Sequence, residues 1–380
     1  MLALELAFWV CVGLIVWTQL GYAAALAVLA RLLRARPVAD EDAVLPELSL
    51  IVAAHNEASV IAARVANALA LDYPRERLQV IVVCDGCSDD TATLARRAGA
   101  DLVLELPRGG KVRAQDAAVE QATGQVVAFS DANAQWRPDA ARRLVGAFAD
   151  ARVGYACGQV RYAQGDSGEA GNQEGLYWRY ELAVRALESR LSSVTGGNGA
   201  IYATRRDAYL VVDPVMGHDL SLPFNIVKRG RRAVYVPEAL SSEKMVPSLG
   251  GEFARKRRMA SHTWPIVMRG GMLSPRGYPP GYALMIFSHR VLRYATPALH
   301  LLALACNVAL VADGGPVVYV VTLGLQLALL AAAALAGALP VRLLLVARYY
   351  VLTTASLAAG LWDWLRHGTD AAWEVAEGTR

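Results

Sequence analysis

Apolar residues are unevenly distributed along this chain, with long stretches near both of its ends. The first, Leu6–Ala30, is interrupted only by Thr18 and Gln19 and is long enough to cross a bilayer as a helix. Three more candidate spans lie near the other end: Ala295–Ala312, Val317–Leu339 and Leu343–Leu361. With 55% hydrophobic residues, the chain is expected to be an integral, multi-pass membrane protein.

Basic residues predict the orientation of the first span. No Lys or Arg precedes it, so the charged front of a secretory signal peptide is missing, whereas Arg31, Arg34 and Arg36 follow it directly. The positive-inside rule then places the N-terminus outside and the next domain in the cytoplasm, at the inner (cytoplasmic) membrane. Residues 1–36 are therefore expected to be an N-terminal transmembrane helix with a basic flank.

Between residues 45 and 276, short β-rich runs alternate with amphipathic segments. Such alternation predicts an α/β domain with a mostly parallel sheet that is covered by helices on both faces. The expected strands are Leu48–Ala53, Leu78–Cys84, Asp101–Leu106, Val126–Ser130 and Val153–Val160. The expected helices are Ser59–Ala70 with Ser59 as its N-cap, Thr91–Arg97, Lys111–Ala122 and Pro138–Ala149.

Acidic residues follow two of these strands. Asp85 ends the second strand, and Asp131-Ala132-Asn133 ends the fourth. In parallel sheets, ligands bind at the carboxyl ends of the strands. Side chains two positions apart on an extended backbone point the same way, so Asp131 and Asn133 could together hold a hard cation that binds a diphosphate. A simple turn, which Asp and Asn both favour, is the alternative.

Other functions match these residues less well. A nicotinamide enzyme would carry G-x-G-x-x-G after its first strand, where residues 53–58 read A-A-H-N-E-A. A phosphatase with an aspartate nucleophile would need a second acid that Asn133 cannot supply. The net charge of +4 fits a basic collar facing the membrane, and no aromatic residues interleave with the basic ones as nucleic-acid binding would require. Cys84 and Cys87 lack the partners of a zinc site and are expected to be small turn residues.

Seven motifs occur in order along the domain. They are V-A-A-H-N-E (52–57), V-C-D-G-C-S-D-D-T (83–91), G-G-K (109–111), D-A-N-A (131–134), G-G-N-G-A-I-Y-A (196–203), G-H-D-L-S-L-P (217–223) and R-K-R-R-M (255–259). In this series the chain resembles the family 2 glycosyltransferases of the membrane-embedded, cellulose- and hyaluronan-synthase-like branch. The resemblance covers the cytoplasmic segment and its flanking helices, and it implies a GT-A fold, which is Rossmann-like with a mostly parallel sheet.

The resemblance assigns the first motifs to a nucleotide-sugar donor. Ala53, His55 and Glu57 fall in what matches the first nucleotide-binding loop. Asp85 matches the acid that reads the uracil or the ribose, so a UDP-sugar is the expected donor. A turn-capping aspartate before Gly86 is the alternative for this position.

The next two motifs are implied to hold the diphosphate. Lys111 matches a lysine near the nucleotide, where its charge would offset that of a phosphate, although a solvated lysine at a helix start fits equally well. Asp131 and Asn133 stand in place of the family's D-x-D and are expected to bind Mg²⁺ or Mn²⁺. Because Asn replaces the second Asp, Asp131 is expected to provide most of the metal binding.

The later motifs resemble the acceptor side of the family's site. Asp219 matches the general base that would take the proton of the attacking hydroxyl, with an N-cap of helix Leu220–Lys228 as the alternative. His218 departs from the family's acidic pattern and is expected to pack. Gly197 and Asn198 belong to a glycine-rich loop that would face the acceptor, or would only form a turn.

The R-K-R-R-M segment stands where the family has Gln-x-x-Arg-Trp. Arg258 matches the arginine that helps hold the leaving diphosphate, and Arg255 replaces the Gln. Met259 replaces the Trp, which makes long-polymer processivity doubtful, but Trp264 and His262 lie one helical turn on and could substitute for it. A basic helix lying on anionic lipid is the alternative, and both roles are compatible.

Together these features predict an inverting, metal-dependent glycosyltransferase with a polysaccharide or lipid-linked acceptor. Membrane lipids are the other expected partners, and an oligomer is left open. A catalytically inactive nucleotide-sugar-binding protein of the same fold is the alternative, and a transporter would need more spans with buried acids. The expected parts are the catalytic domain at 45–276, an interfacial segment at 277–294, transmembrane helices at 295–366 and a tail at 367–380. Three full spans would put that tail outside, whereas a re-entrant last segment would keep it inside.

Overall fold

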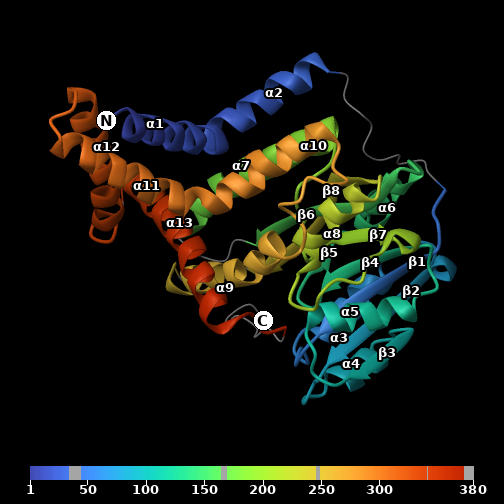
Figure 1. Cartoon of the computed structure of the whole chain (residues 1–380). Coiled ribbons are helices and arrows are strands. Elements are labelled where there is room, and N and C mark those ends of the chain that lie inside the picture. The colour runs from blue at the N-terminus through green and yellow to red at the C-terminus, as the bar shows by residue number, and fades with distance from the viewer. Residues whose placement is uncertain (34–43, 164–168, 245–248, 340, 372–380) are drawn as a thin grey trace.

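The computed structural model describes residues 1–33, 44–163, 169–244, 249–339 and 341–371. Both ends of the chain contribute to a helical arm, and the middle of the chain forms an α/β domain beside it (Figure 1). The N-terminal part of the arm is one long helix composed of α1 (Leu2–Val16), the π-helical turn η1 (Trp17–Gly21) and α2 (Tyr22–Leu32).

Four helices of this described part are long and apolar enough to cross a membrane: Leu2–Leu32, Pro280–Ala312, Val317–Leu335 and Arg342–His367. They coincide with the four apolar stretches of the sequence. The second one starts earlier than its apolar stretch, because α10 (Pro280–Met285), the π-helical turn η5 (Ile286–Val291) and α11 (Leu292–Ala312) follow one another without a break. Most of the expected interfacial segment 277–294 is thus the start of this helix. Its location at a membrane surface stays a prediction.

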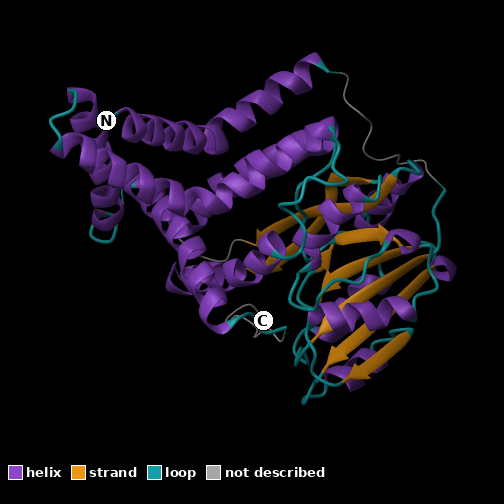
Figure 2. Cartoon of the chain, in the orientation of Figure 1, coloured by secondary structure: helices purple, strands orange, loops and turns teal. Residues whose placement is uncertain are grey.

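A single sheet forms the core of the α/β domain, with the strand order β3-β2-β1-β4-β7-β6-β8-β5 (Figure 2). Strands β3, β2, β1 and β4 are parallel, and β7 is antiparallel to both of its neighbours. Beyond it, β6 and β8 are parallel again and β5 is antiparallel to β8. The strands are β1 Leu48–Ala54, β2 Leu78–Asp85, β3 Leu102–Leu106, β4 Val126–Asp131, β5 Gln135–Trp136, β6 Val153–Ala163, β7 Tyr202–Arg205 and β8 Arg232–Lys244. The mostly parallel sheet that the sequence predicted is confirmed.

Helices cover both faces of this sheet because successive strand residues point to opposite sides. In β1, Leu50 and Val52 pack on one side and Ile51 packs on the other. The first side is covered by α3 (Ile61–Leu69), α4 (Thr91–Arg97) and α6 (Ala140–Gly146). The second side is covered by α5 (Lys111–Glu120) and α8 (His218–Lys228). Every expected helix of the domain is present, Thr91–Arg97 with its expected bounds and the others with shifted ends.

The expected N-cap at Ser59 is wrong. Helix α3 begins only at Ile61, its N-cap is Val60, and no side chain caps it. The preceding chain turns through Asn56, whose φ of 53° is left-handed, so residues 57–60 are used to complete that turn. Two helices that hydrophobic spacing did not predict are α7 (Glu169–Leu191) and α9 (Leu249–Met268).

Helix α13 (Arg342–His367), the last of the arm, is attached along α9 of the α/β domain. Gly360 lies so close that a Cβ on it would be 2.5 Å from the Cβ of Ala260. Trp264 donates its indole N–H to the Leu357 carbonyl at 3.0 Å. After α13, the Thr369 hydroxyl donates to the Ser261 carbonyl at 2.8 Å, and the Ala371 carbonyl touches Gly110. The last described residues therefore lie against the α/β domain.

Candidate active site

The carboxyl ends of β1, β2 and β4 form one rim of the sheet. In the parallel register, Ala53 lies beside Asp131 and Ala54 lies beside Cys84, the neighbour of Asp85. The chain leaves all three strands at the same edge, which is where α/β sheets bind ligands. Asp85 and Asp131 lie on one rim, as the sequence predicted, because β2 and β4 pair with opposite sides of β1.

Side chains and backbone tie the first two loops of this rim together. A ring nitrogen of His55, Nδ1, lies 2.7 Å from the Asp85 carbonyl, and the Glu57 N–H donates to the Thr91 hydroxyl at 2.8 Å. Glu57 is only 9% exposed, and Ala53 is half-buried beside the rim. The segment that resembles a nucleotide-binding loop is thus a rigid turn. The binding roles of Ala53, His55 and Glu57 stay predictions.

The buried carboxylate of Asp85 holds the loop that precedes Lys111. Its two oxygens accept the N–H groups of Gly109 and Gly110 at 2.6 and 3.0 Å, and the Arg108 guanidinium lies 3.5 Å away. A left-handed φ of 91° at Gly110 suits glycine and lets both amides face one carboxylate. Asp85 therefore shapes the donor side of the rim, and its contact with a base or ribose stays a prediction.

Lys111 contacts both Asp131 and the glycine-rich loop. Its ammonium forms an ion pair with Asp131 and lies 3.4 Å from the Gly199 carbonyl. Only 16% of the Lys111 side chain and 25% of the Asp131 side chain are exposed. The alternative of a solvated lysine at a helix start is therefore wrong, because burial and pairing fix its charge at the rim.

Asp131 and Asn133 offer the oxygen ligands that a hard divalent cation prefers. They sit at the end of β4 and in the tight turn after it, where the Ala134 N–H donates to the Asp131 carbonyl at 3.3 Å. Among the described residues, no group of three His, Cys, Asp or Glu side chains could hold a metal by itself. The two side chains thus fit a cation whose remaining ligands come from a bound diphosphate.

A buried arginine is bonded to the residue that precedes this turn. Arg64 is fully buried on α3, donates from Nε to the Ser130 hydroxyl at 3.0 Å and from Nη1 to Asn67 Oδ1 at 2.9 Å. Burial lowers the pKa of Arg64 to about 9, while the nearby charge of Asp131 opposes that shift. Asn67 also bonds both the N–H and the carbonyl of Trp136, at 2.9 and 2.8 Å. The turn that contains Asp131 and Asn133 is therefore held on both sides, by residues that sequence reasoning missed.

An arginine at an inward-facing helix position was the available signal for this clamp. Ile61, Arg64, Val65 and Ala68 form the buried stripe of α3, and arginine is rarely found in such a stripe unless it is paired. The spacing alone could not name its partners, because Ser130 lies on a different strand.

Asp219 occupies the first turn of α8 on the other side of the glycine-rich loop. Its own backbone carbonyl accepts the Gly197 N–H at 2.7 Å. The helix begins at His218 with Gly217 as its N-cap, so the alternative of Asp219 as the N-cap is wrong. The half-buried carboxylate is therefore not consumed by capping, and its role as a base stays a prediction.

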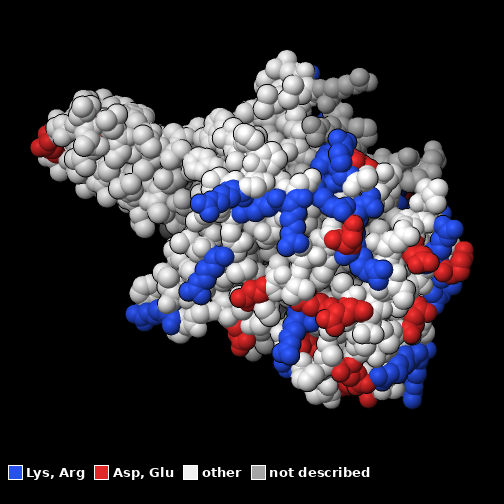
Figure 3. Space-filling model, turned by 45° about the vertical axis from the view of Figure 1, so that its right-hand side comes forward, with Lys and Arg blue, Asp and Glu red and all other residues white. Residues whose placement is uncertain are grey.

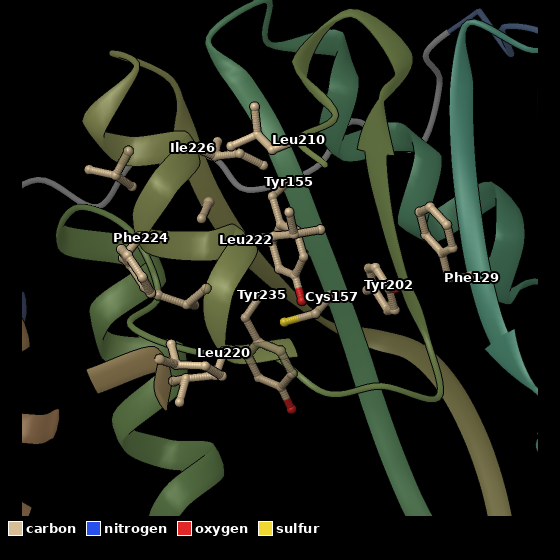
Figure 4. Packing of buried hydrophobic residues seen from close by; sticks show 14 of the residues in the cluster. Phe129, Tyr155, Cys157, Tyr202, Leu210, Leu220, Leu222, Phe224, Ile226 and Tyr235 are labelled. Carbon is tan, nitrogen blue, oxygen red and sulfur yellow. The ribbon is translucent and has the colours of Figure 1, made fainter. Parts of the chain in front are cut away.

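His218 packs, as expected from sequence. Its ring is buried, with Nδ1 3.0 Å from the Tyr202 hydroxyl and Nε2 3.3 Å from the Tyr209 hydroxyl. Burial lowers the pKa of His218 to about 3, so the ring is neutral at physiological pH. Figure 4 shows Tyr202 between Phe129 and Tyr155 on this side of the sheet, and the ring centroids are 4.6 and 5.8 Å apart.

The glycine-rich loop is held by side chains that contact its backbone. A Cβ at Gly197 would collide with the Tyr155 hydroxyl. The amide of Asn198 donates to the Gly158 carbonyl at 2.6 Å and accepts from the Ile201 N–H at 2.9 Å. Asn198 therefore clamps the loop in this structure, and contact of either residue with substrate stays a prediction.

Arg258 and His262 both lie on helix α9. Burial lowers the pKa of His262, a backbone hydrogen bond with Val215 and the charge of Asp219 oppose that shift, and the charge of Arg258 adds to it. The role of Arg258 at a diphosphate stays a prediction. Trp264 is only 8% exposed and packs 6.0 Å from Tyr294, in the seam between α9 and the arm. The substrate-binding role expected of Trp264 stays a prediction. The side chain of Arg255 lies outside the described residues.

The basic cluster on α9 differs from the expected membrane-facing collar. Lys256 donates to the Tyr349 hydroxyl at 2.5 Å, and Arg257 makes two bonds of 2.6 Å to Asp363. Both charges therefore engage α13 within the protein. Elsewhere on the face in Figure 3, Lys and Arg gather across the middle of the molecule, whereas most Asp and Glu lie on the catalytic domain.

Comparison with known proteins bears on the chemistry of this site. Residues 49–210 match the protein family described as Glycosyl transferase family 2. This segment is a glycosyltransferase family 2 domain. The match contains the ends of β1, β2 and β4 and the glycine-rich loop, and it ends before Asp219. The family is therefore identified without the position of the proposed base.

Relatives of the glycosyltransferase domain include enzymes with different names. An N-acetylglucosaminyltransferase of Rhizobium leguminosarum bv. viciae is 26% identical over 237 residues, which cover 58% of this chain and 56% of the relative. A β-monoglucosyldiacylglycerol synthase of a Synechocystis species is 31% identical over 224 residues, or 52% of this chain and 43% of the relative. The chain thus spans about half the length of the curated relatives it matches.

A solved structure extends the likeness to the arm. A mannosyltransferase from Pyrobaculum calidifontis, in complex with GDP-Man and Mn²⁺, has a TM-score of 0.71 and covers 95% of this chain and 99% of its own, with 22% identity. At that identity the likeness establishes the fold. The glycosyltransferase domain has a GT-A fold flanked by helices that could cross a membrane, as the sequence predicted.

Proposed function

We propose that this chain is an inverting membrane-bound glycosyltransferase that moves a sugar from a nucleotide-sugar, in the first instance a UDP-sugar, to a polysaccharide or lipid-linked acceptor. The observation that carries the proposal is the position of Lys111 between Asp131 and Gly199. It brings the rim that would hold a diphosphate next to the loop whose Gly197 is bonded to Asp219. Donor and base thus fall within one continuous site.

In the proposed reaction, Asp219 takes the proton from an acceptor hydroxyl as its oxygen attacks the anomeric carbon. The bond between that carbon and the diphosphate oxygen breaks in the same step, so the sugar configuration inverts. Lys111 and Arg258 offset the negative charge that develops on the leaving diphosphate. No nucleophile of the enzyme is needed.

Asp131 and Asn133 would hold Mg²⁺ or Mn²⁺ on the donor. When bound, the cation neutralises diphosphate charge and orients the leaving group. The solved mannosyltransferase of the same fold contains Mn²⁺ and GDP-Man, which supports a divalent cation and a nucleotide-sugar donor without specifying the base. Ion pairing of Asp131 with Lys111 favours binding of the cation together with the nucleotide, because the diphosphate would provide Lys111 with another anionic partner.

The four apolar helices support a membrane setting, with the catalytic domain in the cytoplasm at the inner membrane. An acceptor growing from or anchored in the lipid would then lie near this domain. This setting supports the cellulose- and hyaluronan-synthase-like branch, with membrane lipids as further partners and oligomers allowed. The relative named β-monoglucosyldiacylglycerol synthase supports a lipid acceptor.

Purified full-length protein should be tested with Mn²⁺ and a panel of UDP-glucose, UDP-N-acetylglucosamine and GDP-mannose. We expect release of the nucleoside diphosphate from at least one donor and loss of that release on addition of EDTA. Failure of the protein to bind UDP, GDP or any of these donors would contradict the proposal as a whole. Binding without turnover would favour the inactive binding protein instead.

A further inference from the structure

A buried charge cluster joins the arm to the catalytic domain. At its centre, Glu188 of α7 is fully buried and accepts the Tyr22 hydroxyl of α2 at 2.7 Å. Its carboxylate also lies 2.8 Å from His289 Nδ1 of η5 and accepts the Thr195 N–H at 3.0 Å. Burial alone would raise the pKa of Glu188, but the neighbouring His289 and Arg290 hold that pKa below its usual value. The cluster therefore keeps a charged carboxylate at the junction.

Two π-helical turns meet beside this cluster. Trp17 of η1 donates its indole N–H to the Ser288 hydroxyl of η5 at 2.9 Å, and the Thr18 hydroxyl donates to the Ser288 carbonyl at 2.8 Å. π-Helical turns are rare and occur frequently at functional sites, because they turn side chains away from the regular helical positions. Here the turn in η5 carries His289 and Arg290 at the junction.

Arg290 extends from this junction to the glycine-rich loop. Its Nε donates to the Thr195 hydroxyl at 2.9 Å. Its guanidinium lies so close to Gly196 that a Cβ there would be 2.6 Å from Nη2. The next residue, Gly197, donates its N–H to the backbone carbonyl of Asp219. A chain of direct contacts thus runs from an arm helix to the proposed base.

Arg293, one turn further along the same helix, provides a contrast. It forms an ion pair with Glu181 of α7, seven residues before Glu188, and Glu181 also lies 3.4 Å from His289 Nε2. Both arginines therefore take part in the junction with α7 through buried charge. Of the two, only Arg290 has described contacts with the residues next to Gly197.

We infer that Arg290 is a positioning residue for the acceptor side of the site, setting Thr195 and Gly196 so that Gly197 holds Asp219 in place. The inference rests on the proposed function and adds a control of its base from the arm. Among the described contacts, Arg290 reaches neither Asp85 nor Lys111: Asp85 is bonded to Gly109 and Gly110, and Lys111 pairs with Asp131 and meets the loop only at Gly199, two residues beyond Gly197. Loss of Arg290 should accordingly reduce turnover and spare donor binding.

The test compares Arg290→Gln with Arg293→Gln in the full chain. Both variants remove one cation from the same helix and from the same junction. Nucleoside diphosphate release from the active donor of the panel, with Mn²⁺ and with water as the acceptor, should fall about ten- to a hundredfold in kcat for Arg290→Gln, with donor KM within twofold. For Arg293→Gln both constants should stay within threefold of the unaltered protein.

Thr195→Val serves if Arg290→Gln does not fold, because it removes only the hydroxyl that Arg290 holds. It should lower kcat in the same direction by a smaller factor. Hydrogen exchange gives a second readout: peptides that contain Gly197 should exchange at least tenfold faster in Arg290→Gln and not in Arg293→Gln, while residues 126–136 are unchanged.

Equal losses in the two arginine variants, or a parallel rise in donor KM, would overturn the inference and leave the proposed function standing. An unaltered protein that neither binds nor turns over any donor would instead refute the proposed function, and the inference with it. A kcat loss confined to Arg290→Gln and Thr195→Val would establish the positioning role.

Discussion

The donor and acceptor halves of the site are built in different ways. The proposed donor residues lie at or after the carboxyl ends of parallel strands, and most of their partners belong to the same rim, as when Asp85 accepts the amides of Gly109 and Gly110. On the proposed acceptor side, Asp219 is bonded to Gly197, and the loop that contains Gly197 is bonded to Arg290 of an arm helix. The donor contacts are thus made mainly within the α/β domain, with Ala371 also lying against Gly110, whereas the acceptor contacts include a charged residue of the arm.

This difference bears on which changes each half is expected to tolerate. Contacts between neighbouring strands and loops hold the proposed donor residues, so their geometry is expected to persist when the flanking helices change. The loop bonded to the proposed base is held by Arg290 of the arm, so the proposed acceptor half is expected to change with those helices. Variants on the two halves should therefore separate catalysis from donor binding.

The largest effect is expected on the acceptor half. Asp219→Asn removes the proposed base and should lower kcat by about 10²- to 10⁴-fold, because general base catalysis contributes that much. UDP affinity, measured by calorimetry with Mn²⁺, should remain within twofold. Asp213→Asn, on an exposed aspartate before α8, is the matched control and should leave kcat unchanged. Equal turnover by Asp219→Asn would remove that residue from the mechanism.

A structural effect is expected on the donor half. Asn67→Ala leaves the N–H and carbonyl of Trp136 and the Nη1 of Arg64 without this partner, which should lower the free energy of unfolding by about 3 kcal/mol. UDP affinity should fall with it, since the turn of Asp131 loses one support. Asn225→Ala, which removes a single bond to the Ser221 carbonyl, should cost about 1 kcal/mol and leave UDP affinity intact. Denaturant unfolding in detergent measures both.

Asp116 of α5, which is bonded to Tyr209, should make the stability of the fold depend on pH. Burial raises the pKa of Asp116 to about 6, with Glu120 raising it further and the hydrogen bond from Tyr209 opposing the shift. The folded state then binds this proton more tightly than the unfolded state, so its contribution to stability is present below about pH 4 and is lost as the pH rises through 6.

Asp116→Asn should abolish this part of the pH profile. The variant should match the unaltered protein near pH 4 and be more stable above pH 6, by up to roughly 2–3 kcal/mol. Thermal unfolding midpoints recorded between pH 4 and 8 provide the measurement. An unchanged difference across that range would show that Asp116 does not titrate as its burial demands.

The smallest effect is expected at the metal turn itself. Asn133→Asp restores a second carboxylate beside Asp131 and should lower the Mn²⁺ concentration needed for half-maximal UDP binding about three- to tenfold, because it adds one unit of attractive charge. Without metal, the same variant should bind UDP more weakly, since the new charge repels the diphosphate. A rise in the Mn²⁺ requirement would place the cation away from this turn.

The proposed donor half was largely predictable because its signals are local. Apolar strands that end in Asp85 and Asp131 predict both the sheet and the shared rim, since the carboxyl ends of parallel strands lie on one edge of the sheet. The acceptor half was less so. Asp219 came from resemblance to a family, and its link to Arg290 depends on a contact between segments 95 residues apart in the sequence.

The missed elements have a physical cause in common. The stretch that forms α7 is polar around much of its circumference, because Glu181 and Glu188 face Arg293 and His289 in the interior and not solvent. Hydrophobic spacing cannot reveal a helix whose inner face carries paired charges. Arg64 escaped notice for the same reason.

The contacts of Thr369 with Ser261 and of Ala371 with Gly110 have a topological consequence. A chain that leaves the catalytic domain at Pro280 and touches it again at Thr369 must return to the side of the bilayer on which it started. Three candidate spans lie between these points, so an even number of them can traverse the bilayer fully. A fluorescent protein fused to the C-terminus would then share a compartment with the α/β domain, whereas one fused to Met1 would lie at the far end of the arm.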